Sequence, residues 1–121
     1  MKTCLLVDDS RTIRALVKPM LTDLGFQVME AGDGQQALNA CDTQIPDVVL
    51  LDWNMPVMNG LEFLKAFRAR PDGQSALVVF CTTESSIDHI RIGLEAGANE
   101  YIMKPFDREI LQDKLAEVGA I

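Results

Sequence analysis

The amino-acid sequence predicts an α/β fold of the (βα)5 type, in which helices cover both faces of a doubly wound, five-stranded parallel sheet. Short apolar runs alternate with segments whose apolar residues recur at the spacing of an amphipathic helix. The runs lack the polar alternation of a half-exposed strand, which indicates strands buried on both faces. Right-handed crossovers then place the carboxyl ends of all strands at one edge of the sheet.

In the first part of the chain, strands are expected at residues 3–7, 26–30 and 48–51. An apolar stripe at helical spacing follows the first strand: Ile13, Leu16, Val17, Met20, Leu21 and Leu24. Ser10 or Asp9 can cap the helix that carries this stripe, and Gly25 is a natural end. Pro19 should kink or loosen the helix without ending it, because the stripe continues past the proline. A second helix is expected over about residues 35–43.

In the second part, strands are expected at residues 77–81 and 101–103. A third helix begins at Gly60 and is broken at Pro71, since proline removes a backbone donor. A weaker fourth helix ends at Gly97, and the last helix covers residues 107–118. Each strand is therefore followed by a helix, as the fold class requires.

The composition is that of one soluble domain over residues 1–121, with no linker and no output domain expected. Because 18 acidic residues outnumber 11 basic ones, the net charge of −7 argues against nucleic-acid and anionic-membrane binding. No apolar run approaches the ~20 residues of a membrane span, and no signal peptide is evident. Cys4, Cys41 and Cys81 lack ligand spacing and indicate reduced, buried thiols. We expect a cytoplasmic monomer.

Polar residues cluster where the apolar runs end. They are Asp8-Asp9 after the first run, Asp52 after the third, Thr82-Thr83 after the fourth and Lys104 after the fifth. Any one of the acids could be a helix cap. Together they should meet at the edge of the sheet that carries the ligand crevice in open α/β folds.

This set of residue types suits phosphoryl chemistry with a metal ion. Three neighbouring carboxylates raise one another's pKa unless a cation lies between them. Mg²⁺ meets this need, because it binds carboxylate and carbonyl oxygens and keeps waters that a phosphoryl oxygen can replace. The Lys104 ammonium and the Thr82 hydroxyl supply further contacts for a phosphoryl group. Metal, lysine, threonine and a nucleophilic carboxylate are sufficient for phosphoryl transfer.

With these residues in this order, the chain resembles the receiver domain of two-component response regulators over essentially its whole length. It is most similar to the small, stand-alone chemotaxis regulators. The shared features are Asp8-Asp9, Asp52 followed by Trp53-Asn54-Met55-Pro56, Gly60, Thr82 and Lys104-Pro105-Phe106. The resemblance implies the flavodoxin-like strand order 2-1-3-4-5. It also implies a cis peptide bond before Pro105.

The resemblance assigns a role to each residue of the cluster. Asp52 is the implied phosphate acceptor. Asp9 and Asp52 would bind Mg²⁺ directly, and Asp8 would bind it through water. The backbone carbonyl of Asn54 would complete the ligands, and Lys104 would pair with a phosphoryl oxygen.

The same resemblance implies a switch. The Thr82 hydroxyl would move to bind the phosphoryl group, and Tyr101 would then swing inward, which changes the surface of the fourth helix, fifth strand and fifth helix. Asn54 and Glu84 would tune how fast water attacks the phosphoaspartate, and this pair indicates a short-lived phosphorylated state.

Three residues lie outside this scheme. Thr83 stands where many relatives carry a smaller alanine and would narrow access to the site. Pro19 would alter the helix surface on which kinases usually dock. His89, the only histidine, is expected on a solvated or partner-facing side of the fourth helix.

The sequence therefore predicts a phosphoacceptor switch with self-catalysed phosphotransfer and autodephosphorylation, and not an enzyme. Its donor would be a histidine kinase, and its target protein, one candidate being a flagellar motor switch, would bind the fourth helix, fifth strand and fifth helix. A phosphorelay shuttle and a kinase-regulating receiver outside motility remain open.

Two other classes share parts of the pattern. Aspartyl-phosphate phosphatases usually open with Asp-x-Asp-x-Thr, whereas this chain reads Asp8-Asp9-Ser10-Arg11-Thr12. Flavodoxin-type flavin carriers need a loop rich in Ser, Thr and Gly after the first strand, where this chain has two aspartates.

Overall fold

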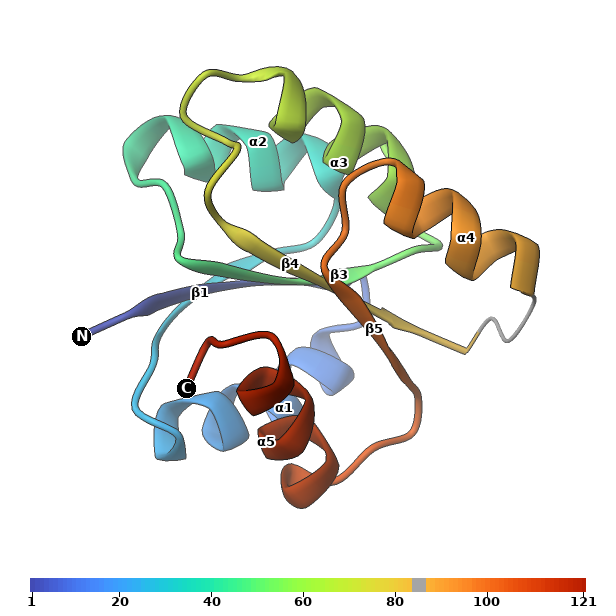
Figure 1. Ribbon diagram of the computed structural model, residues 1–121. Helices are drawn as coiled ribbons and strands as arrows, with labels where there is room; N and C mark the ends of the chain where they lie inside the picture. Colours follow the sequence, from blue (N-terminus) through green and yellow to red (C-terminus); the bar gives the residue numbers. More distant parts are fainter. Residues whose placement is uncertain (84–86) are drawn as a thin grey trace.

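The computed structural model describes residues 1–83 and 87–121. The strands are β1 (Thr3–Val7), β2 (Gln27–Ala31), β3 (Val48–Asp52), β4 (Leu77–Thr82) and β5 (Glu100–Met103). The helices are α1 (Arg11–Asp23), α2 (Gly34–Thr43), α3 (Gly60–Ala69), α4 (Ile87–Glu95) and α5 (Arg108–Glu117). Helices α1 and α5 cover one face of the sheet, and α2, α3 and α4 cover the other (Figure 1). No helix in the described ranges has the length and apolar character needed to cross a membrane.

All strands are parallel, and their order, β2-β1-β3-β4-β5, confirms the predicted one. The register brings the strand ends to one level, because Asp52 lies beside Cys81, the residue before Thr82. Asp8 and Lys104 directly follow the ends of β1 and β5. The sheet alone thus carries the predicted polar residues to one edge.

Two apolar layers hold the sheet between the helices. Phe63, Phe67 and their neighbours fill the layer under α2 and α3, and Leu21, Leu111 and Leu115 fill the layer under α1 and α5. Strands β1 and β3 are apolar on both sides because each side packs against one of these layers.

Strand β2 differs from the prediction in two ways. It is an edge strand with exposed residues at Gln27 and Glu30, so it is not buried on both faces. It also starts one residue later than expected. The cause is the end of α1, where Gly25 has a φ of 97° and the Phe26 N–H donates to the Leu21 carbonyl.

The first helix forms as predicted in spite of its internal proline. The Ser10 hydroxyl accepts a hydrogen bond from the Ile13 N–H at 3.2 Å, which confirms Ser10 as the N-cap. Helix α1 continues through Pro19 to Asp23. Burial of Val17 and Leu21 on its inner face stabilises the helix on both sides of the proline.

The loop after β3 contains a γ-turn centred on Val57. The Met58 N–H donates to the Pro56 carbonyl at 2.8 Å, and Val57 has a φ of 68°. This φ is costly for a β-branched residue, and the Val57 side chain is 84% exposed, so packing does not offset the cost. The turn presents the Met58 carbonyl to the Gly34 N–H at 2.9 Å, which ties the loop to α2.

Relief of this backbone strain should stabilise the protein. We expect Val57→Asn to raise the free energy of unfolding by about 1 kcal/mol, because asparagine tolerates a positive φ. Val57→Gly should give a smaller gain, since glycine also increases the entropy of the unfolded chain. Val57→Ala keeps the Cβ and is the matched control. Urea unfolding of the variants measures the effect, and equal midpoints for Val57→Asn and Val57→Ala would contradict it.

Candidate functional site

Three carboxylates meet at the carboxyl edge of the sheet, as the sequence predicts. Asp8 and Asp9 follow β1, Asp52 ends β3, and one carboxylate oxygen from each lies within 4.8 Å of the others. Asp8 is buried, Asp52 is partly buried and Asp9 is exposed. The cluster therefore opens to solvent beside Asp9.

Hydrogen bonds fix both the backbone and the carboxylate of Asp8. Its N–H donates to the Ala31 carbonyl at 3.1 Å, and its carbonyl accepts a hydrogen bond from Arg14 Nη1. Its carboxylate accepts a hydrogen bond from the Ser10 N–H at 2.9 Å and another from Lys104 Nζ at 2.7 Å. These contacts offset the cost of burying a charge.

Lys104 bridges two of the carboxylates. Its Nζ lies 2.7 Å from Asp8 Oδ2 and 3.3 Å from Asp52 Oδ1. Its N–H donates to the Thr82 carbonyl at 2.9 Å, and its peptide bond to Pro105 is cis, as predicted. Burial alone would lower the pKa of Lys104, but the two carboxylates outweigh burial and hold this pKa above its ordinary value.

The pKa of Asp52 is raised in the folded protein. Burial is the largest cause that raises its pKa, from 3.8 to about 6. The charge of Lys104 opposes this rise, whereas the charges of Asp8 and Asp9 add to it. The Lys104 ammonium thus does not offset the combined effect of burial and of the two neighbouring charges.

The donor set fits a hard divalent cation. Carboxylate oxygens within a few ångströms of one another are the ligands that Mg²⁺ prefers. A cation among them would also favour the charged form of Asp52, whose pKa is raised by burial first and by the neighbouring carboxylates second. The side of the cluster beside Asp9 is exposed to solvent.

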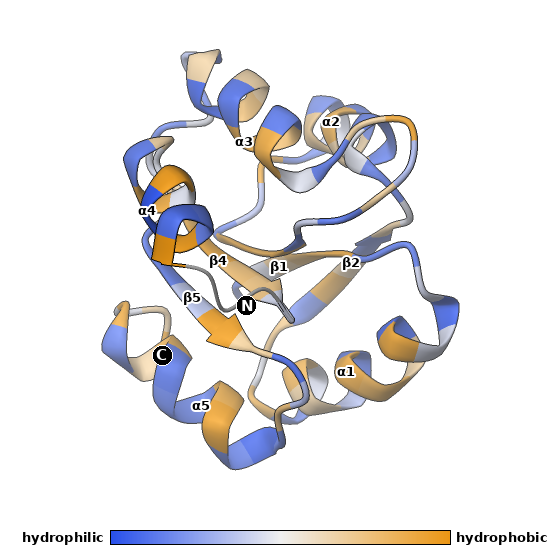
Figure 2. Cartoon of the chain, turned by 90° about the vertical axis from the view of Figure 1, so that its right-hand side faces the viewer, coloured by the Kyte–Doolittle hydropathy of each residue, from blue (hydrophilic) through white to orange (hydrophobic). Residues whose placement is uncertain are grey.

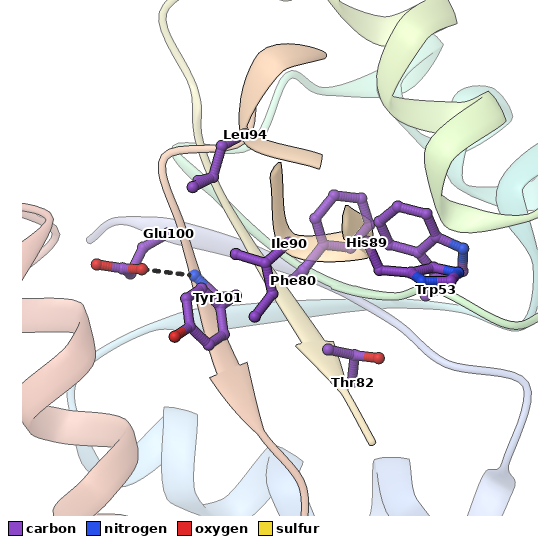
Figure 3. A pocket seen from close by; sticks show the side chains of 8 residues that line it. All are labelled: Trp53, Phe80, Thr82, His89, Ile90, Leu94, Glu100 and Tyr101. Carbon is purple, nitrogen blue, oxygen red and sulfur yellow. Dashed lines mark hydrogen bonds between the residues drawn. The ribbon is translucent and has the colours of Figure 1, made fainter. Parts of the chain in front are cut away.

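Thr82 and Tyr101 line one cleft beneath α4, together with Trp53, Phe80, His89, Ile90, Leu94 and Glu100 (Figure 3). Thr82 is buried at the end of β4, and Tyr101 on β5 is partly buried. The cleft has room for about one water molecule. The structure therefore brings the two predicted switch residues to a common space, while their movement stays a prediction.

The expectation for His89 is wrong. Its side chain is partly buried and its ring packs edge-on against Trp53, with the ring centroids 5.2 Å apart. Trp53 also contacts Phe80 on β4, at 4.8 Å between centroids. Helix α4 turns this side inward because Gly93 lets it approach the same aromatic pair, where a Cβ would meet Phe80 at 3.0 Å.

The other predicted residues of the site are Asn54, Thr83 and Glu84. Asn54 is exposed in the loop two residues after Asp52. Thr83 is exposed and lines a groove of about 360 Å³ between α1 and the residues that follow β5. Glu84 lies outside the described residues. Arg14, which contacts the Asp8 carbonyl, was missed, because nothing in the pattern of α1 distinguishes it from a surface arginine.

Comparison with known proteins decides between the classes that share these features. Residues 4–116 match the family described as response regulator receiver domain. The chain belongs to this family. The phosphatase and flavin-carrier alternatives are therefore not supported.

Relatives of this receiver include chemotaxis proteins. It is 43% identical over 117 residues to a chemotaxis protein CheY homolog of Campylobacter jejuni, covering 94% of this chain and 89% of that protein. It is 40% identical to chemotaxis protein CheY1 of Helicobacter pylori over 116 residues, covering 94% of each chain. The structure of CheY4 of Vibrio cholerae superposes with a TM-score of 0.93 at 39% identity, covering 98% of each chain. The receiver is thus of the chemotaxis type.

Proposed function

We propose that this receiver accepts a phosphoryl group on Asp52 and signals by changed affinity for a target protein. The observation that carries the proposal is the contact of Asp52 with Lys104 inside the cluster formed with Asp8 and Asp9. A carboxylate flanked by a fixed ammonium and a cation site is suited to attack a phosphorus atom, because charge on the phosphoryl oxygens is neutralised.

The donor we propose is a phosphohistidine of a histidine kinase. An Asp52 oxygen forms a bond to phosphorus, the bond from phosphorus to the imidazole nitrogen breaks, and the imidazole leaves with its electron pair. Lys104 Nζ holds one phosphoryl oxygen. Mg²⁺, held by Asp9, Asp52 and the carbonyl of Asn54, with Asp8 acting through water, would neutralise the others.

Thr82 and Tyr101 carry the response. The Thr82 hydroxyl binds the new phosphoryl oxygen, and Tyr101 moves further into the cleft that Thr82 leaves. Such a two-state element converts a local charge into a change of surface. Asn54 and Glu84 set the lifetime of the phosphoaspartate, and the polar and acidic pair gives a short one.

The target surface lies on α4, β5 and α5, which face the viewer in Figure 2. These elements expose the apolar side chains Ile87, Ile92, Leu94, Met103 and Ile110. An exposed apolar face beside the switch residue Tyr101 suits a protein partner. A motor switch protein fits a chemotaxis-type receiver that acts as a cytoplasmic monomer, and a phosphorelay partner is the alternative.

Phosphorylation can be tested directly by intact-mass measurement. With acetyl phosphate as the phosphoryl donor, we expect one phosphoryl group per chain, only when Mg²⁺ is present. Asp52→Asn should abolish this gain, while Asp113→Asn, which removes an exposed carboxylate from α5, should leave it unchanged. A phosphoryl gain that persists in Asp52→Asn would contradict the assignment.

A further inference from the structure

We propose that Arg14 is a positioning residue of the metal site, which acts by holding the peptide unit between Asp8 and Asp9. The inference rests on the proposed binding of Mg²⁺ at the carboxylate cluster. It assigns a role to a residue of α1 that contributes no ligand atom.

Arg14 reaches from the first turn of α1 back to the end of β1. Its Nη1 donates to the main-chain carbonyl of Asp8, and its Nε donates to Glu30 Oε1 at 3.2 Å. Its side chain is only 18% exposed. The guanidinium is thus fixed between the loop after β1 and the neighbouring strand β2.

The contact matters because of what the Asp8 carbonyl is joined to. That carbonyl and the Asp9 N–H belong to one planar peptide unit, so its orientation determines where the Asp9 Cα lies. The peptide unit before Asp8 is fixed separately by the hydrogen bond to the Ala31 carbonyl at 3.1 Å. The hydrogen bond from Arg14 fixes the peptide unit that follows Asp8.

Asp9 needs such a restraint more than its neighbour does. The Asp8 carboxylate is held by Ser10 and Lys104. The Asp9 carboxylate is exposed, and within the described residues no hydrogen bond or ion pair fixes it. Its position therefore depends on the backbone, and the backbone depends on Arg14.

If Arg14 acted on the metal site only through its charge, its removal would change the affinity for Mg²⁺ in the opposite direction. Removal of a positive charge close to the cluster would strengthen the binding of Mg²⁺ by Coulomb's law. Removal of a positioning contact would weaken it, and outer contacts of this kind change metal affinity by 10- to 100-fold in general. The direction of the change thus separates the two roles.

Lys18 provides a matched control. Its Nζ binds Glu30 Oε2 at 3.3 Å from the same helix, so Lys18→Ala removes one positive charge and one contact with Glu30. The contact of Arg14 with the Asp8 carbonyl is left in place. Arg14→Lys tests rescue, because a lysine ammonium can still donate to a carbonyl.

The test is a Mg²⁺ titration followed by the fluorescence of Trp53, the only tryptophan, which adjoins Asp52. We expect Arg14→Ala to weaken binding roughly 10-fold, Arg14→Lys to recover part of this loss, and Lys18→Ala to bind as the wild type does. Equal or tighter binding by Arg14→Ala would overturn the inference. Urea unfolding without metal checks that every variant is folded at the titration temperature.

A second measurement needs no metal. Backbone ¹⁵N relaxation should show increased motion at Asp9 and Ser10 in Arg14→Ala but not in Lys18→Ala. If the wild type fails to bind Mg²⁺, the proposed metal site is wrong, and the relaxation data still decide whether Arg14 orders this peptide unit. Unchanged relaxation in Arg14→Ala would overturn the inference.

Discussion

Arg68→Ala is expected to lower the free energy of unfolding by about 3–4 kcal/mol. Nε and Nη2 of Arg68 donate to the Gly97 carbonyl at 3.0 and 2.8 Å. Nη1 donates to the carbonyls of Gly73 and Ala76 at 2.9 and 2.8 Å, and Nη2 also donates to Asn99 Oδ1 at 3.0 Å. All five N–H groups are used, and alanine would leave these carbonyls in a partly buried place without a donor.

The position of Arg68 explains the size of the effect. The side chain lies on α3 and joins the loop before β4 to the turn between α4 and β5. Burial lowers the pKa of its guanidinium, which still remains charged. Both β4 and β5 carry residues of the site, so the loss of Arg68 should also loosen the cleft around Tyr101.

Urea unfolding followed by circular dichroism measures the loss. Arg68→Lys should recover little of it, because an ammonium cannot reproduce the planar fork of donors. The matched control is Arg91→Ala, which breaks only exposed ion pairs with Asp88 and Glu95 and should change stability by at most about 0.5 kcal/mol. A loss below about 1 kcal/mol for Arg68→Ala would show that water replaces the guanidinium.

The apolar pattern was sufficient to predict the strands, the helices and the edge of the sheet at which the polar residues meet, for a physical reason. Buried parallel strands are marked by apolar runs, and their register is constrained by burial. Residues that end such runs therefore meet in space, and Asp8, Asp52 and Lys104 do so. The resemblance added what spacing alone could not supply, which is the strand order and the roles expected of these residues.

Some features of the structure cannot be predicted from the spacing of residues in the sequence. Arg14 and Arg68 donate to main-chain carbonyls of distant segments, and in sequence they are ordinary helix arginines. His89 was misplaced because its burial depends on Trp53, which comes from another element of the fold. The positive φ of Val57 contradicts local propensity and is visible only in the structure.

Replacement of Asp52 by asparagine is expected to stabilise the protein. At pH 7.5 without metal, Asp52→Asn is expected to raise the free energy of unfolding by about 1–3 kcal/mol. Asp52 is partly buried, and its pKa is raised from 3.8 to about 6 in the fold, with burial as the largest cause. Ionisation of the wild-type carboxyl therefore opposes folding, and asparagine has no such ionisation.

The pH range follows from the sign of this shift. Below about pH 3 the carboxyl is protonated in both the folded and the unfolded state, so it makes no pH-dependent contribution to stability. As pH rises from about 4 through 6, the unfolded chain loses its proton first, and the wild type loses stability. The advantage of Asp52→Asn should accordingly vanish near about pH 3 and be complete above about pH 7. The matched control is Asp113→Asn, which removes an equal charge from an exposed site on α5.

Mg²⁺ should remove most of the difference in stability between the two proteins. A ligand that binds only the folded state adds about 2.7 kcal/mol at a concentration of 100 times its dissociation constant. Wild type has the carboxylate that would hold the ion, so saturating Mg²⁺ should offset most of its deficit, while Asp52→Asn should respond little. Urea unfolding in EDTA and in Mg²⁺ separates these effects. A wild type that is the more stable protein in EDTA at pH 7.5 would show that Lys104 and water already neutralise the cluster. The burial and repulsion that make the Asp52 carboxylate destabilising without metal are thus the properties expected to favour a bound cation in the proposed site.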